Sequence, residues 1–81
     1  MKQFQANGTL LTIGERWLFS SDNHGMIVEV LNSGRDGYPF VRCLQIVDQA
    51  PIGWYVGLEQ DTTIGWVSFW TKLEGQNRSE E

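Results

Sequence analysis

The side chains in this sequence that could act as a nucleophile or a base are few and far apart. His24 is the one histidine, in the stretch SDNHG, and Cys43 is the one cysteine. A hydrolytic triad needs a nucleophile partnered by a base, and a zinc site needs several ligands that lie close together. Because these two residues supply neither arrangement, the sequence predicts no enzyme, no metal site and no cofactor.

Each candidate for chemistry also has a structural interpretation. His24 fits a turn that tolerates an unusual backbone angle, and a free cysteine such as Cys43 is more often a small buried hydrophobe than a nucleophile. Asp22, Asp36 and Asp61 fall in predicted turns, where an aspartate commonly bonds the backbone. The stretches NGTLLTIG and SGRDG also lack the pattern of a phosphate-binding loop. What remains is the chemistry of aromatic rings.

The chain contains four Trp, four Phe and two Tyr, and the densest group is the stretch IGWVSFW. An extended strand there would place Trp66 and Trp70 on one face, and Val67 and Phe69 on the other. The smaller apolar pair fits the inside of a tight barrel better, so we expect the two tryptophans to face outward unless the TLLTI segment covers them. A single helical turn at SFWTKL would also leave them adjacent.

The stretch GWYVGL offers a second group of rings. As a strand it would place Trp54 partly inside and Tyr55 outside, with the tyrosine hydroxyl in water. Trp17, in the stretch RWLF, is assigned to the core. The candidate binding residues are therefore Trp66, Trp70, Tyr55, Trp54 and Tyr38.

Turn signals divide the chain at short intervals. Nine Gly and two Pro fall in polar clusters between short apolar runs, a spacing that is typical of a β-sandwich or small barrel. The runs are rich in aromatic and β-branched residues, which favour strands. We predict strands at residues 10–13, 16–20, 26–32, 39–48, 53–58 and 65–70.

Two of these strands differ in how clearly their sequence indicates them. In the stretch GMIVEVLN, the alternating residues Met26, Val28 and Val30 are assigned to the core face, and the turn-rich NSGRDG predicts a hairpin into the next strand. The following stretch, PFVRCLQIVDQA, also matches helical spacing. A strand is preferred there for its β-branched content, and an α+β fold with one short helix near residues 40–49 is the alternative.

The succession of hairpin-linked strands, with the stretches GERW, GMIVEV and WVSFWTKL, resembles the SH3-like small barrels, which include Tudor-type and KOW-type modules. The resemblance covers about residues 14–74 and implies an all-β, partly open barrel of five or six short antiparallel strands. It also implies ligand binding on exposed rings, as Tudor-type members do with methylated lysine or arginine. The ending FWTKLEGQ is similar to that of short uncharacterised phage and prophage proteins, which implies an accessory or host-modulating protein.

Length and composition set the limits of this interpretation. The 81 residues have room for one domain, which we place at residues 1–74, and residues 75–81 are expected to form a disordered polar tail. No apolar stretch resembles a signal peptide or approaches the roughly 20 residues of a membrane span, which favours a cytoplasmic protein.

The function predicted from these observations is a non-catalytic binding module that contacts a protein or peptide through its aromatic residues. One alternative is binding of single-stranded nucleic acid by base stacking. The formal net charge of −4 and the scattered cations argue against it, because phosphate binding favours clustered positive charge. A second alternative is a structural subunit that forms homo-oligomers through the same rings.

Overall fold

The computed structural model describes residues 2–6, 8–34, 38–62 and 69–73, and in this part of the chain the secondary structure is strand and turn, without a helix. The prediction of an all-β fold is therefore confirmed. The strands are β1 (Gln3–Ala6), β2 (Thr9–Thr12), β3 (Arg16–Ser21), β4 (His24–Ser33), β5 (Pro39–Ile46), β6 (Glu59–Asp61) and β7 (Trp70–Leu73).

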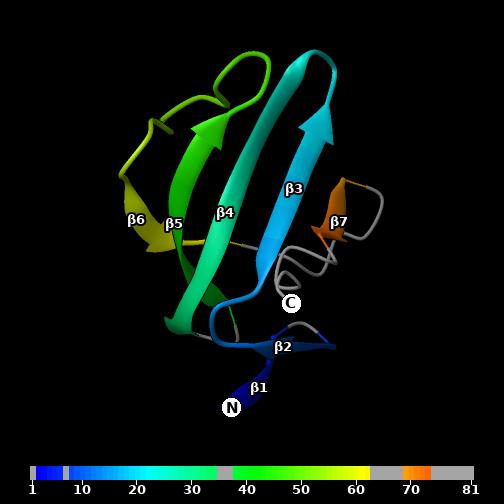
Figure 1. The fold of residues 1–81 in the computed structure, drawn as a ribbon, viewed down its shortest axis with the longest axis vertical. Helices are drawn as coiled ribbons and strands as arrows, with labels where there is room; N and C mark the ends of the chain where they lie inside the picture. Colours follow the sequence, from blue (N-terminus) through cyan, green and yellow to red (C-terminus); the bar gives the residue numbers. More distant parts are fainter. Residues whose placement is uncertain (1, 7, 35–37, 63–68, 74–81) are drawn as a thin grey trace, which may run out of the picture.

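The strands form two antiparallel sheets. A large sheet has the order β6-β5-β4-β3-β7, with the long strand β4 at its centre, and β1 pairs with β2 in a separate hairpin at one end of it (Figure 1). Strands that follow one another in the large sheet pair throughout, except that β7 returns to the far side of β3. The last described strand therefore completes one edge of the sheet.

The hairpin between β3 and β4 shows how local sequence sets a register. Ser21 and His24 are Cα partners, and the two residues between them have positive φ, 45° for Asp22 and 68° for Asn23. A two-residue turn of this kind matches the twist of the flanking strands, and Asp and Asn tolerate it better than most residues. His24 is thus the first residue of β4, and its neighbours carry the unusual backbone angles that the sequence suggested for it.

The core lies on one face of the large sheet. Met26, Val28 and Val30 are all buried, as their alternation in the sequence predicts, while Ile27 and Glu29 between them are half-buried. Among the described residues, the hydrophobic core cluster comes from both sheets: Ala6, Leu11, Trp17, Met26, Val28, Val30, Val41, Cys43 and Trp70. The burial of Trp17 in this core is also as predicted.

Strand β5 settles the choice that the sequence left between a strand and a helix at residues 40–49. Buried Val41 and Cys43 alternate with exposed Arg42, which is the period of a strand, so the helical alternative is wrong. Pro39 is the first residue of β5, a position where the missing N–H is tolerated. The register of β4 against β5 shifts at two places, and such bulges bend a strand.

Three parts of the predicted strand pattern differ from the structure. Strand β1 was not expected; it pairs with β2, and this hairpin contributes Ala6 and Leu11 to the core. The predicted strand at 53–58 is replaced by turns, with β6 following it. Of the predicted strand at 65–70, residues 65–68 lie outside the described part of the chain, as does the predicted tail at 75–81, and β7 begins only at Trp70.

The prediction for Trp70 is wrong in its orientation. Its side chain is only 5% exposed, whereas Phe69, which was expected inside, is 38% exposed. The reason is the register with β3, where Trp70 lies opposite Phe19 on the core face. The two rings are in contact at 5.1 Å between centroids. Trp70 is therefore a core residue.

Candidate binding surface

Two consecutive turns connect β5 to β6. The Trp54 N–H donates to the Pro51 carbonyl at 3.0 Å, and the Leu58 N–H donates to the Tyr55 carbonyl at 3.0 Å. Each turn has an aliphatic second residue: Ile52 in the stretch PIGW and Val56 in the stretch YVGL. The same pattern thus occurs twice, four residues apart.

A glycine stands third in both turns. Gly53 has φ 87° and Gly57 has φ 95°, values that L side chains rarely adopt and that a type II turn requires at its third position. This repeated glycine is the signal that sequence reasoning missed, because the rings and valine around it favour a strand. Only the glycine spacing distinguishes two turns from one strand here.

The second turn is fixed to the edge of the large sheet. The Gly57 N–H donates to the Cys43 carbonyl, and the Cys43 N–H donates to the Leu58 carbonyl, both at 2.8 Å. The partly buried Trp54 packs against the core between the two turns. A rigid base therefore supports the residues at the turn tips.

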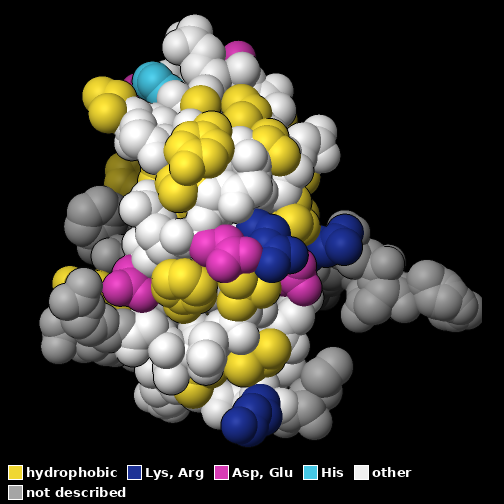
Figure 2. Space-filling view, turned by 90° about the vertical axis from the view of Figure 1, so that its left-hand side faces the viewer, with side chains coloured by type: hydrophobic (Ala, Val, Ile, Leu, Met, Phe, Trp, Pro, Cys, Tyr) yellow, Lys and Arg dark blue, Asp and Glu magenta, His cyan; other side chains and the backbone are white. Residues whose placement is uncertain are grey.

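The side chains at the turn tips project into solvent. Ile52 is 98% exposed, Tyr55 61% and Val56 59%. We call these three residues the turn patch. Hydrophobic side chains gather in the upper part of Figure 2, over the segment that joins β5 to β6. Apolar residues at turn tips are unusual, since Gly, Pro, Asn, Asp and Ser normally dominate turns.

A charged pair lies next to the turn patch. Arg42 donates to Glu59 Oε2 from Nε at 2.7 Å and from Nη2 at 2.6 Å. In the middle of Figure 2, acidic and basic side chains meet in a band below the hydrophobic group. The turn patch thus has a polar border on the side of β6.

The predicted site residues have different positions in this structure. Tyr55 is exposed and Trp54 is partly buried, both as predicted. Tyr38 is exposed too, but it precedes β5. It lies five residues, or about 16 Å along an extended strand, before Cys43, the residue of β5 to which the second turn is hydrogen-bonded. Trp70 is buried, and Trp66 lies outside the described residues. The structure therefore brings together Tyr55 and Trp54, and it adds Ile52 and Val56.

The groups that could act as a base or a nucleophile are held in structural positions. His24 Nδ1 lies 3.0 Å from the carbonyl oxygen of Asp22. Burial raises the pKa of the Cys43 thiol, and a backbone hydrogen bond with Gln45 opposes that effect only in part. Within the described residues there is no group of three or more His, Cys, Asp or Glu that could hold a metal ion. Those residues also include no helix long and apolar enough to cross a membrane.

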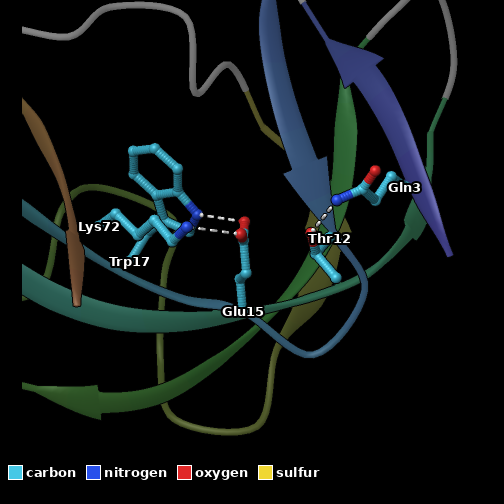
Figure 3. Close-up of polar contacts among 5 residues, drawn as sticks. All are labelled: Gln3, Thr12, Glu15, Trp17 and Lys72. Carbon is cyan, nitrogen blue, oxygen red and sulfur yellow. Dashed lines mark hydrogen bonds and ion pairs between the residues drawn. The ribbon is translucent and has the colours of Figure 1, made fainter. Parts of the chain in front are cut away.

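Glu15 joins three parts of the fold, and nothing in the sequence singled it out. The Trp17 indole N–H donates to Glu15 Oε1 at 3.2 Å, and Lys72 Nζ lies 3.0 Å from Oε2 (Figure 3). The Glu15 carbonyl also accepts a hydrogen bond from the Val30 N–H at 2.8 Å. One side chain and its backbone thereby connect β3, β4 and β7.

The surroundings of Glu15 favour its charged form. Burial alone would raise its pKa, but hydrogen bonds with the Thr12 backbone, with Lys72 and with the Trp17 indole outweigh burial, and the pKa lies below the ordinary value of 4.5. The carboxylate is therefore ionised at neutral pH. Its interactions are internal, which gives it a structural role.

Comparisons with protein families, with curated proteins and with solved structures find no match to this chain.

Proposed function

We propose that this protein is a non-catalytic binding module that holds an apolar segment of a partner protein on the turn patch. One observation carries the proposal: two successive turn tips are aliphatic, and Ile52 is 98% exposed. The glycines allow the turns to form with any residue at the tip, so an apolar tip does not serve the turn itself. Burial against a partner would remove this apolar surface from water.

Tyr55 is the expected anchor of such an interface. Aromatic residues are enriched among the side chains that carry most of the binding energy, and a tyrosine contributes a large apolar area with a polar end. Trp54 fixes the position of its neighbour through its own packing on the core. The Arg42–Glu59 ion pair provides the polar border that interfaces commonly have around an apolar centre.

The pairing of charges within the chain favours a protein partner over single-stranded nucleic acid. Arg42 is paired with Glu59, and Lys72 is paired with Glu15, so both cations are partly neutralised within the chain. Binding along a phosphate backbone needs unpaired cationic side chains that displace the counterions of the nucleic acid. Three further expectations belong to this proposal. The SH3-like type of barrel and an accessory role of the phage type rest on the sequence resemblance alone, and a cytoplasmic location rests on the hydropathy of the sequence.

The experiment is a selection of short peptides from a random display library on the immobilised protein, followed by affinity measurements on the selected peptides. We expect apolar peptides, and we expect Tyr55→Ala or Ile52→Ser to weaken their binding by about 30-fold, since truncating an anchor costs about 2 kcal/mol. Raising the salt concentration should change the affinity little, because exposed charges contribute little to it.

Val47→Ser is the matched control, since Val47 is 52% exposed and lies outside the turn patch. It should leave peptide affinity unchanged. Peptides that bind equally well to both turn-patch variants would refute the proposal. Tight binding of an oligothymidylate with a steep dependence on salt would favour the nucleic-acid alternative instead.

A further inference from the structure

A row of alternating charges crosses the large sheet on the face opposite the core. Successive Cα partners along this row are Glu59 with Arg42, Arg42 with Glu29, and Glu29 with Arg16. It therefore contains one residue from each of β6, β5, β4 and β3, in the order negative, positive, negative, positive. We call these four residues the charge row.

The charge row has partly exposed apolar neighbours. Leu18 and Ile27 are partners on the next row of the same face, and Leu73 of β7 pairs with Arg16 at the end of the charge row. All three are half-buried. The β1–β2 hairpin packs its buried residues, Ala6 and Leu11, into the core on the other side of the sheet. A mixed face of this kind can contact another surface.

The order of charges makes this face complementary to itself. A two-fold axis parallel to the strands, midway between Arg42 and Glu29, reverses the order of the row in a second copy. Glu59 then faces Arg16 of the other copy, and Arg42 faces Glu29 of the other copy. Every position meets the opposite charge. A two-fold axis along the row would instead place each residue opposite the same residue of the other copy, so that like charges would face each other.

We propose that a second copy of this chain docks on the charge row, forming a symmetric dimer with the two sheets face to face. The five strands β3, β4, β5, β6 and β7 have 6, 10, 8, 3 and 4 residues. With strands about 4.8 Å apart and a rise of about 3.3 Å per residue, the face of the sheet has an area of roughly 500 Å² per copy. The total of about 1,000 Å² is at the lower limit for a specific interface. For an interface of this size we expect a weak dimer, with a dissociation constant of about 0.1 mM. It includes Arg42 and Glu59 at the border of the turn patch, whereas Ile52, Tyr55 and Val56 are not part of the charge row.

Sedimentation velocity of the full chain between about 10 μM and 1 mM tests the association, since this range brackets the expected constant. We expect the mean mass to rise from one chain toward two, and to fall again in high salt, which screens partly exposed charges. Glu29→Arg and Arg42→Glu should each weaken association at least tenfold, because like charges then face each other at the centre.

An equimolar mixture of those two variants should restore the dimer, since all four positions are then complementary. If either variant fails to fold in a melting curve, Glu59→Arg and Arg16→Glu form a second pair with the same property at the ends of the row. Asp48→Arg is the control: it makes the same charge change on an exposed turn outside the row and should leave association intact.

A wild-type chain that stays monomeric at about 1 mM would overturn the proposal. So would single variants that associate like the wild type, or a mixture that stays monomeric. Tyr55→Ala should not change the association, so a dimer lost in that variant would assign self-association to the turn patch and would also overturn the charge-row dimer. The charge row and the proposed function therefore fail separately.

Discussion

At the scale of single residues, burial separates rings that look alike in the sequence. Trp70 and Tyr55 both lie in short aromatic stretches, yet the first is 5% exposed and the second 61%. The difference comes from the element to which each belongs: Trp70 pairs with Phe19 across β3 and β7, and Tyr55 begins a turn. Ring type alone therefore does not identify a contact surface.

Glu15 gives a prediction at the same scale. Its pKa is lowered in the folded chain, so its contribution to stability is fully present above about pH 4.5 and is lost as the pH falls through the lower folded value. We expect Glu15→Gln to reduce the free energy of unfolding by roughly 1–2 kcal/mol at neutral pH, because it loses charge-assisted hydrogen bonds. Below the folded pKa this difference should shrink. Urea unfolding at a series of pH values measures both effects.

Lys72→Met is the companion variant, because it removes one of the groups that lower the pKa of Glu15 and leaves the carboxyl in place. Because the pKa of Glu15 is then less depressed in the folded chain, this variant should lose less stability than the wild type as the pH falls below about 4.5. A Glu15→Gln profile parallel to the wild type at every pH would show that this carboxyl is not ionised differently in the folded and unfolded chains.

At the scale of elements, the turns decide where the candidate surface lies. Gly57 has φ 95°, and a Cβ added to it would have no other atom within 4 Å, so a methyl group there would meet strain in the backbone and no clash. We expect Gly57→Ala to cost about 1–2 kcal/mol of unfolding free energy, measured by urea denaturation. Val56→Ala, its exposed neighbour, should change stability by no more than about 0.5 kcal/mol. Equal, small effects for both would contradict the turn assignment.

Elements also show how far the sequence alone could be used. The alternation of Met26, Val28 and Val30 predicted both a strand and its core face, because the period of a strand is local information. The face of Trp70 was mispredicted, since it depends on the register with β3, a strand distant in the chain. The turn patch was missed because apolar residues at the tips concealed two glycine turns.

At the scale of the whole molecule, Cys43 reports on the cooperativity of the fold. The thiol is 1% exposed in the central part of β5, and its pKa is raised by burial. We expect a thiol reagent to label it about a thousandfold or more slowly than a free thiol, at a rate that rises with denaturant as global unfolding does. Val47→Cys in a Cys43→Ala background provides an exposed thiol for comparison. Rapid labelling that ignores denaturant would indicate local opening of β5.

The return of β7 to β3 has a consequence for the chain as it is synthesised. Translation delivers β3, β4 and β5 before β7, and their hairpins need only neighbouring residues. Trp17 and Phe19 then lie at an open edge until Trp70 leaves the ribosome, because β7 is the strand that pairs with that side of β3. Non-local pairing of this kind is slow, and an open apolar edge attracts other nascent chains or a chaperone. Pairing of β7, the last described strand, thus determines when this apolar edge of the nascent chain is covered.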